Sequence, residues 1–146
     1  MRRQDLPLLL ASTRIARPDE SEPLDRVRMQ KAVFLAELRG SENWRHLYEF
    51  IPYNWGPFSR DLQDDLGELL CDGRLDRREF QSGKYHSYVT TPSGFDEIRD
   101  VLESLQPPEL TFLIAIRQFV VTRTFNQLLR DVYRAYPAYA VNSQLR

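Results

Sequence analysis

Four carboxylates follow one another at helical spacing near the middle of the chain. Asp61, Asp64, Asp65 and Glu68 stand at relative positions i, i+3, i+4 and i+7, which places them on one face of a helix. Hard cations take carboxylate oxygens as ligands, so two of the four could hold a metal ion. A solvated helix surface, or a contact surface for a basic partner, explains the spacing without a metal. We favour these two interpretations over a metal site.

The other chemically versatile side chains are too scattered to form a catalytic centre. His46 and His86 are the two histidines, and neither has a neighbour at the spacing of paired metal ligands. Cys71 is the single cysteine, so an internal disulfide is excluded, and its place after two leucines is typical of a small buried hydrophobic residue. Phosphate-binding loops and Gly-x-Ser-x-Gly nucleophile motifs are absent from the sequence. We therefore expect no enzyme activity, no catalytic residue, no metal site and no cofactor.

Composition indicates one globular domain without a general affinity for nucleic acid or membranes. The 146 residues are 42% hydrophobic and 28% charged, and the net charge is −1. No apolar stretch approaches the roughly 20 residues of a membrane span. The apolar run Leu8–Ala11 follows Asp5 and Pro7 and is too short for a signal peptide. We expect a cytoplasmic protein that does not bind a membrane.

The element that positions the carboxylates is a helix with a clear beginning and end. Ser59 precedes it as the expected N-cap residue, whose hydroxyl accepts from a free N–H of the first turn. Asp72-Gly73 ends it. A stripe of leucines at helical spacing predicts its buried side: Leu62, Leu66, Leu69 and Leu70.

Other periodic segments surround this helix. We predict helices from about residue 6 to 17, from 25 to 39, from 93 to 105, from 109 to 122 and from 125 to 136. Ser93 with Asp96, and Thr124 with Gln127, form capping-box patterns at two of these starts. Two strand-like runs flank Ser82-Gly83, which predicts a β-hairpin. The residues expected to share the buried face of the 25–39 helix are Val27, Lys31, Phe34, Leu35 and Leu38.

This order of elements predicts the fold class. Helix, turn, helix, β-hairpin and helix follow one another as in a winged-helix domain. We predict a mostly α protein with a small β-hairpin (α+β), forming a single domain over residues 1–146. The winged-helix core would span about 20–106, and a C-terminal helical extension about 107–146. The two helices of that extension offer a surface through which a homodimer could form.

An aromatic turn leads into the acidic helix. In the run from Tyr53 to Phe58, Gly56 permits backbone angles that other residues resist. We expect Trp55 and Phe58 to anchor this turn in the core.

Three stretches carry a resemblance to a known group: MQKAVFLAEL, YEFIPYNWGPFSRDLQDDLGELLCDGRL and LLRDVYRAYPAYAVNS. They resemble small prokaryotic and phage-associated proteins that include the Panacea, or antitoxin-like, group. The likeness covers roughly residues 25–90, where Gln30-Lys31, Tyr53, Gly56-Pro57 and Asp72-Gly73 fill the places of the shared motifs. It implies a winged-helix protein that acts by binding a toxin protein, a defence protein or DNA, without a cofactor or catalysis.

Protein binding is the first functional hypothesis. The helix from Ser59 to Cys71 has a formal charge of −3, so phosphates would repel it from the position that a winged helix usually takes in the major groove. A basic protein partner would be attracted instead. The expected contact residues are Tyr53, Trp55, Arg60, Asp61, Asp64, Asp65 and Glu68.

Nucleic-acid binding is the alternative hypothesis. Basic residues concentrate in the predicted hairpin and near the C-terminus, and two hairpin tyrosines could stack on bases. The residues expected to serve a winged-helix DNA-binding regulator are Arg74, Arg77, Arg78, Lys84, Tyr85, Tyr88, Arg130 and Arg134.

Overall fold

The computed structural model describes residues 2–13, 23–80, 83 and 85–145. Its elements, in chain order, are α1 (Asp5–Ser12), α2 (Arg26–Arg39), the 3-10 helix η1 (Glu42–Trp44), β1 (Ile51–Tyr53), β2 (Gly56–Phe58), α3 (Arg60–Cys71), β3 (Leu75–Phe80), β4 (Tyr85–Thr90), α4 (Pro92–Ser104), α5 (Pro107–Thr122), α6 (Phe125–Ala135) and the 3-10 helix η2 (Pro137–Ala140). Helices dominate, and the strands form two antiparallel pairs. The prediction of a mostly α protein with a small β component is confirmed at this level.

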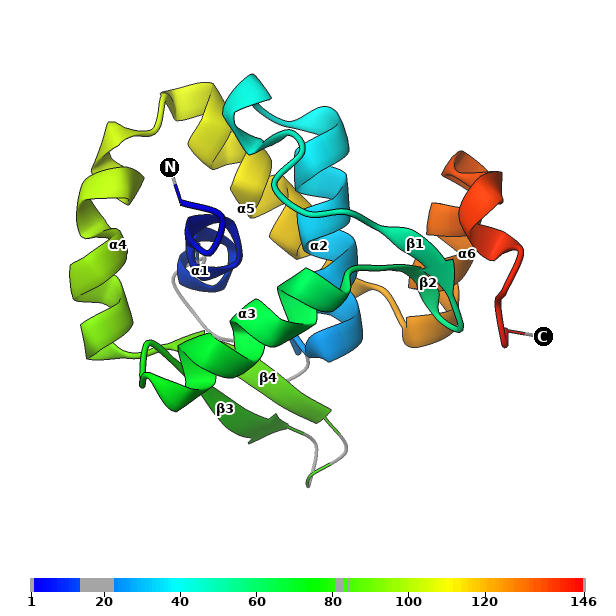
Figure 1. The fold of residues 1–146 in the computed structure, drawn as a ribbon, viewed down its shortest axis with the longest axis horizontal. Coiled ribbons are helices and arrows are strands. Elements are labelled where there is room, and N and C mark those ends of the chain that lie inside the picture. Colours follow the sequence, from blue (N-terminus) through cyan, green and yellow to red (C-terminus); the bar gives the residue numbers. More distant parts are fainter. Residues whose placement is uncertain (1, 14–22, 81–82, 84, 146) are drawn as a thin grey trace.

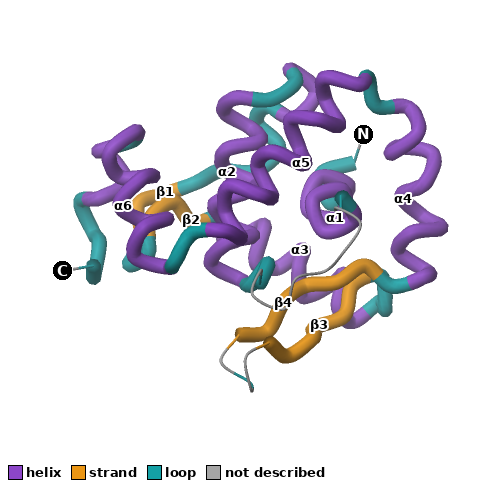
Figure 2. The backbone as a smooth tube through the Cα atoms, turned by 180° about the vertical axis from the view of Figure 1, so that it is seen from behind, coloured by secondary structure: helices purple, strands orange, loops and turns teal. Residues whose placement is uncertain are grey.

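Helix α1 is surrounded by other helices. Figures 1 and 2 show it end-on, with α2, α3, α4 and α5 around it. All of its residues from Asp5 to Ser12 are buried, as expected for a helix that is apolar on every side. The predicted first helix was longer, reaching residue 17, but α1 ends at Ser12, and residues 14–22 lie outside the described part.

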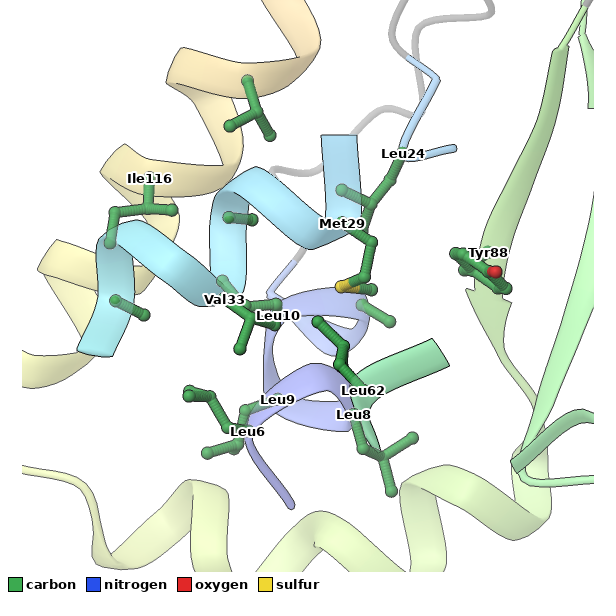
Figure 3. Packing of buried hydrophobic residues seen from close by; sticks show 14 of the residues in the cluster. Leu6, Leu8, Leu9, Leu10, Leu24, Met29, Val33, Leu62, Tyr88 and Ile116 are labelled. Atoms are coloured by element: carbon green, nitrogen blue, oxygen red, sulfur yellow. The ribbon is translucent and has the colours of Figure 1, made fainter. Parts of the chain in front are cut away.

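The hydrophobic core joins α1 to every helix around it. Figure 3 shows Leu6, Leu8, Leu9 and Leu10 of α1 packed near side chains of α2, α3 and α5. The leucines of the α3 stripe, Leu62, Leu66 and Leu69, are fully buried, as predicted. Leu38 was expected on the buried face of its helix and is instead exposed, because it lies near the end of α2, where the neighbouring elements no longer cover it. Phe95 of α4 is also exposed.

Side-chain caps fix where most helices begin. Ser59 accepts from Leu62 N at 3.2 Å, and Thr124 and Gln127 form the predicted capping box of α6. Helix α4 differs from the prediction, because Thr91, not Ser93, is its N-cap residue and accepts from Gly94 N at 3.0 Å. Pro92 then occupies the first helical position, where its fixed φ is favourable and its missing N–H is not needed.

The strands β1 and β2 form a hairpin that the sequence patterns did not predict. Pro52 pairs directly with Pro57, next to the closing pair of Tyr53 with Gly56. Antiparallel pairs alternate between hydrogen-bonded and non-hydrogen-bonded positions, so two opposed prolines can occupy a position where neither N–H is needed. Both prolines are therefore compatible with a short ladder.

The strands β3 and β4 form the predicted second hairpin. Their register runs from Leu75 opposite Thr90 to Phe80 opposite Tyr85, so the connection is four residues long rather than two. Gly83 in this connection has a φ of +87°, and Ser82 lies outside the described residues. Leu24 lies beside the outer edge of β4, and its carbonyl oxygen accepts a hydrogen bond from Tyr88 N at 2.9 Å.

Candidate functional site

The acidic face of α3 holds the N-terminal segment of the same chain. Asp65 is 3% exposed, and its carboxylate accepts from Arg3 Nε at 2.8 Å, Arg3 Nη2 at 3.0 Å and Tyr48 Oη at 2.7 Å. Burial alone would raise the pKa of Asp65, but the hydrogen bonds from Arg3, Tyr48 and Gln4 outweigh it and hold the pKa below its ordinary value. Asp65 is therefore a structural acceptor.

Two more of the predicted contact carboxylates take part in this internal contact. Arg3 Nη1 lies 3.6 Å from Asp61 Oδ2, and Gln4 Nε2 donates to Glu68 Oε2 at 2.6 Å. The expectation that all four acids face solvent is thus wrong for Asp65, and it is only partly right for Asp61 and Glu68, which remain exposed. Asp64 is the one fully free carboxylate of the four in the described part of the chain.

The formal charge of α3 is partly compensated in the folded protein. Arg60 and Asp64 are both exposed and lie at i and i+4, with Gln63 between them. Because Arg3 pairs with Asp65 and approaches Asp61, the repulsion expected from the formal charge of −3 is reduced. The charge argument against nucleic acid, and the one in favour of a basic partner, are both weaker than the sequence indicated.

The predicted nucleic-acid residues do not form one surface. Arg74 is half-buried and donates to Glu97 at 3.0 Å and Gln4 at 3.0 Å, so it belongs to the structural network beside α3. Tyr88 is 3% exposed and burial raises its pKa, so it cannot stack on a base. Lys84 and the side chain of Tyr85 lie outside the described residues.

Four of the predicted arginines are exposed, in two separate places. Arg77 and Arg78 lie on β3, and Arg130 and Arg134 lie one turn apart on α6. Figures 1 and 2 place the β3–β4 hairpin well away from α6.

The β1–β2 hairpin presents apolar side chains to solvent. Ile51 is 51% exposed, Tyr53 47% and Trp55 39%. Tyr53 stacks on Phe58 with ring centroids 5.0 Å apart, and Trp55 meets Phe125 of α6 edge-on at 5.2 Å. Trp55 was expected to be anchored in the core, but the hairpin carries it to the surface, where α6 supports one side of its ring.

A cavity of about 350 Å³ opens beside these aromatic residues. It lies between α2, the hairpin and the first turns of α3. Four apolar or aromatic side chains line it, Val27, Tyr53, Trp55 and Phe58, and four that are polar or charged, Arg26, Gln30, Lys31 and Gln63, together with Gly56.

Two neighbouring residues of α2 tie the hairpin to α3. Gln30 makes a reciprocal pair with Ser59, donating from Nε2 to Ser59 O at 3.0 Å and accepting from Ser59 N at 2.9 Å. Lys31 Nζ donates to Pro57 O at 3.2 Å. Gln30-Lys31 and Gly56-Pro57, which carry part of the resemblance described above, are therefore in direct contact.

Lys31 is the polar residue of this region that the site hypotheses missed. It is 2% exposed, and burial lowers its pKa to about 7, only partly offset by the Asp25 carboxylate. The signal was present in the sequence, because Lys31 falls on the buried face of the predicted 25–39 helix. A lysine on an apolar face is a reason to look for a cavity.

The rest of the described chain adds no further reactive centre to this site. Among the described residues, no three His, Cys, Asp or Glu side chains lie close enough to hold a metal ion. No helix there is long and apolar enough to cross a membrane. Cys71 is exposed rather than buried as predicted, because it lies at the last residue of α3, past the leucine stripe.

Comparisons with protein-family models, with curated proteins and with solved structures found no match to this chain.

Proposed function

We propose that this protein is a non-catalytic regulatory or adaptor module that binds another protein through the β1–β2 hairpin. The observation that carries the proposal is the clustering of exposed apolar side chains. Six large hydrophobic residues of the described chain are exposed, and three of them, Ile51, Tyr53 and Trp55, lie within five positions of one hairpin. Exposed aromatic residues beside a cavity are typical of the centres of protein interfaces.

The proposed surface differs from the one expected from the sequence. Tyr53 and Trp55 stay at its centre, and Arg60 and Asp64 border it on the outward side of α3. Asp65 leaves the surface because Arg3 and Tyr48 cover it. Asp61 and Glu68 lie beside the N-terminal segment, where they could contact a partner only at its edge.

We also propose that the fold is a winged helix related to the Panacea, or antitoxin-like, group. The order of α2, α3 and the β3–β4 hairpin supports this relation. The contact of Gln30 and Lys31 with the segment from Pro57 to Ser59 also supports it, since it gives the shared motifs one structural role. The relation implies a toxin or a defence protein as the partner, in the cytoplasm.

A capture experiment with matched variants tests the proposed surface. The double variant Tyr53→Ser with Trp55→Ser removes the aromatic surface, and Phe95→Ser removes an equally exposed aromatic side chain of α4 as a control. We expect native protein and Phe95→Ser to enrich the same partner from lysate, and the double variant to lose it at an unchanged melting temperature. Enrichment of the same partner by all three proteins would contradict the proposal.

Winged-helix DNA binding is the second candidate, favoured by the exposed arginines. Arg77 with Arg78, and Arg130 with Arg134, are available for phosphate contacts. If the protein binds DNA with either pair, the corresponding double alanine variant should flatten the slope of log affinity against log salt by roughly one to two. A gel shift that shows no salt-dependent binding by the native protein excludes this candidate.

A further inference from the structure

We propose that the cavity between α2, the β1–β2 hairpin and α3 binds a carboxylate carried on an aromatic or similarly flat apolar group. This inference concerns ligand binding inside the cavity. It goes beyond the proposed function and does not require that the hairpin also binds a protein.

The walls and size of the cavity suit the apolar part of such a ligand. Its volume of about 350 Å³ lies at the lower end of the range of small-molecule sites. Tyr53, Trp55 and Phe58 contribute three aromatic side chains, with Tyr53 and Phe58 already stacked on each other. Aromatic rings bind other flat groups by stacking or edge-to-face contact.

Lys31 supplies the reason to expect a carboxylate. Its ammonium has three N–H donors, of which one is used, by Pro57 O. No carboxylate of the described residues lies within ion-pair distance of Lys31 Nζ. The nearby Asp25 is already held by Arg28 Nη1 at 2.7 Å. A buried amine without a counter-charge is costly, and a carboxylate entering the cavity would supply that charge and accept from the remaining donors.

The other polar groups of the cavity agree with this ligand. Arg26 lines the cavity and is exposed, so it adds a second positive charge at the opening. Gln63 also lines it, and Gln63 Oε1 is buried without a hydrogen-bond partner among the described residues. An N–H group next to the ligand carboxylate would satisfy this oxygen. No acidic side chain is among the lining residues.

The backbone at Gly56 is closely surrounded on the side of Lys31 and α6. Gly56 has a φ of +89°, and a Cβ at this position would lie 3.2 Å from Lys31 Cε and 3.4 Å from Tyr133 Cε1. Lys31 of α2 and Tyr133 and Leu129 of α6 therefore all pack close to Gly56. The amine itself is held by its hydrogen bond to Pro57 O.

Matched acids and amides test the proposal on the native protein. We would titrate benzoate, phenylacetate and indole-3-acetate, each against its primary amide, and follow binding by calorimetry and by the NMR signals of Lys31 and Trp55. At least one acid should bind about 10-fold or more tightly than its amide, since the amide keeps the apolar group but lacks the charge. Equal affinity within every pair, or no binding by any acid at millimolar concentration, would overturn the proposal.

Variants locate the binding. In Lys31→Met the difference between acid and amide should disappear, whereas Arg39→Met, which removes a cation from a separate cavity between α2, α5 and α6, should keep it. Trp55→Ala should weaken acid and amide alike. Unchanged acid binding in Trp55→Ala would place the ligand elsewhere and overturn the proposal, even if Lys31→Met does not fold.

A second arm distinguishes the source of the carboxylate. Short peptides that end in tryptophan or phenylalanine would be compared with a free C-terminus and as C-terminal amides. Tighter binding of the free acids than of these peptides indicates a small-molecule ligand, and the reverse order indicates the C-terminus of a protein. Failure of both the acids and the free-carboxylate peptides to bind more tightly than their amides contradicts the assignment.

Discussion

Asp65 and Lys31 represent two different solutions for a buried charge. The charge of Asp65 is balanced by a bidentate contact with Arg3, and its carboxylate also accepts a hydrogen bond from the Tyr48 hydroxyl. Lys31 has one carbonyl partner and faces a cavity. A satisfied buried carboxylate is a structural element, whereas a buried amine with spare donors indicates a place for a ligand.

Replacing Asp65 should destabilise the fold, and replacing Asp64 should not. Asp65→Asn removes the charge partner of Arg3, and we expect a loss of about 2–4 kcal/mol in the free energy of unfolding, toward the lower end because the Arg3 side chain is 42% exposed. Asp64→Asn, on the outward side of α3, should change it by less than about 0.5 kcal/mol. Urea titration of both variants measures this, and equal effects would contradict the structural role of Asp65.

The same pair sets the response to acid. The pKa of Asp65 is below its ordinary value in the folded protein. Between the folded pKa and the ordinary carboxyl pKa, the folded state therefore binds fewer protons than the unfolded state. The stabilisation is complete above the ordinary carboxyl pKa of about 4 and is lost as the pH falls through the folded value. The difference in stability between native protein and Asp65→Asn should therefore shrink below about pH 4.

The buried amine of Lys31 should make the free energy of unfolding depend on pH in the neutral to basic range. Its pKa falls from 10.5 to about 7 on folding, so the unfolded state binds more protons between these two values and stability rises with pH across this window. Relative to Lys31→Met, the native free energy of unfolding should increase by up to about 1.4 kcal/mol per pH unit between pH 7 and 10. Parallel pH profiles for the two proteins would show that the amine is not desolvated.

Sequence patterns placed Lys31 on a buried helix face, as observed, but placed Asp65 on an exposed face. Its spacing of three residues from Leu62 and four from Leu69 puts it next to the buried stripe, which is a signal that the four-carboxylate pattern obscured. The residues that neutralise it could not be predicted, because Arg3 lies 62 positions away in the sequence. Pairing between distant segments is not encoded in any local pattern.

At the level of elements, the β1–β2 hairpin is the feature on which the proposed function depends. Its aromatic side chains form the candidate surface, and its second strand is fixed by Gln30 and Lys31 of α2. The helices were predictable because their apolar periodicity and caps are local. The hairpin was not, since its ladder contains only three pairs, one of them between two prolines.

Two glycines of neighbouring elements should respond in opposite directions to alanine. Gly56 requires a positive φ and has Lys31 Cε and Tyr133 Cε1 close to the position of a Cβ, so Gly56→Ala should cost about 1–3 kcal/mol. Gly67 lies inside α3 with nothing within 4 Å of that position, so Gly67→Ala should stabilise by about 0.5–1 kcal/mol. Thermal and urea unfolding check both. An unchanged free energy of unfolding in Gly56→Ala would contradict the positive φ and the close contacts at Gly56.

Across the whole molecule, the candidate surfaces lie apart from each other. Figure 1 shows the β1–β2 hairpin beside α6 and the β3–β4 hairpin apart from both. A partner bound at the aromatic hairpin would cover 51–58 and the start of α2, whereas nucleic acid bound by Arg77 and Arg78 would cover the β3–β4 hairpin. The two binding hypotheses therefore predict different footprints.

Amide hydrogen exchange, with and without the captured partner, distinguishes these footprints most directly. Our account predicts slower exchange on binding in residues 51–58 and in the adjoining part of α2, with little change in 75–90 and at Arg130 and Arg134. Slower exchange confined to the β3–β4 hairpin or to α6, with residues 51–58 unchanged, would contradict the assignment of the β1–β2 hairpin as the binding surface.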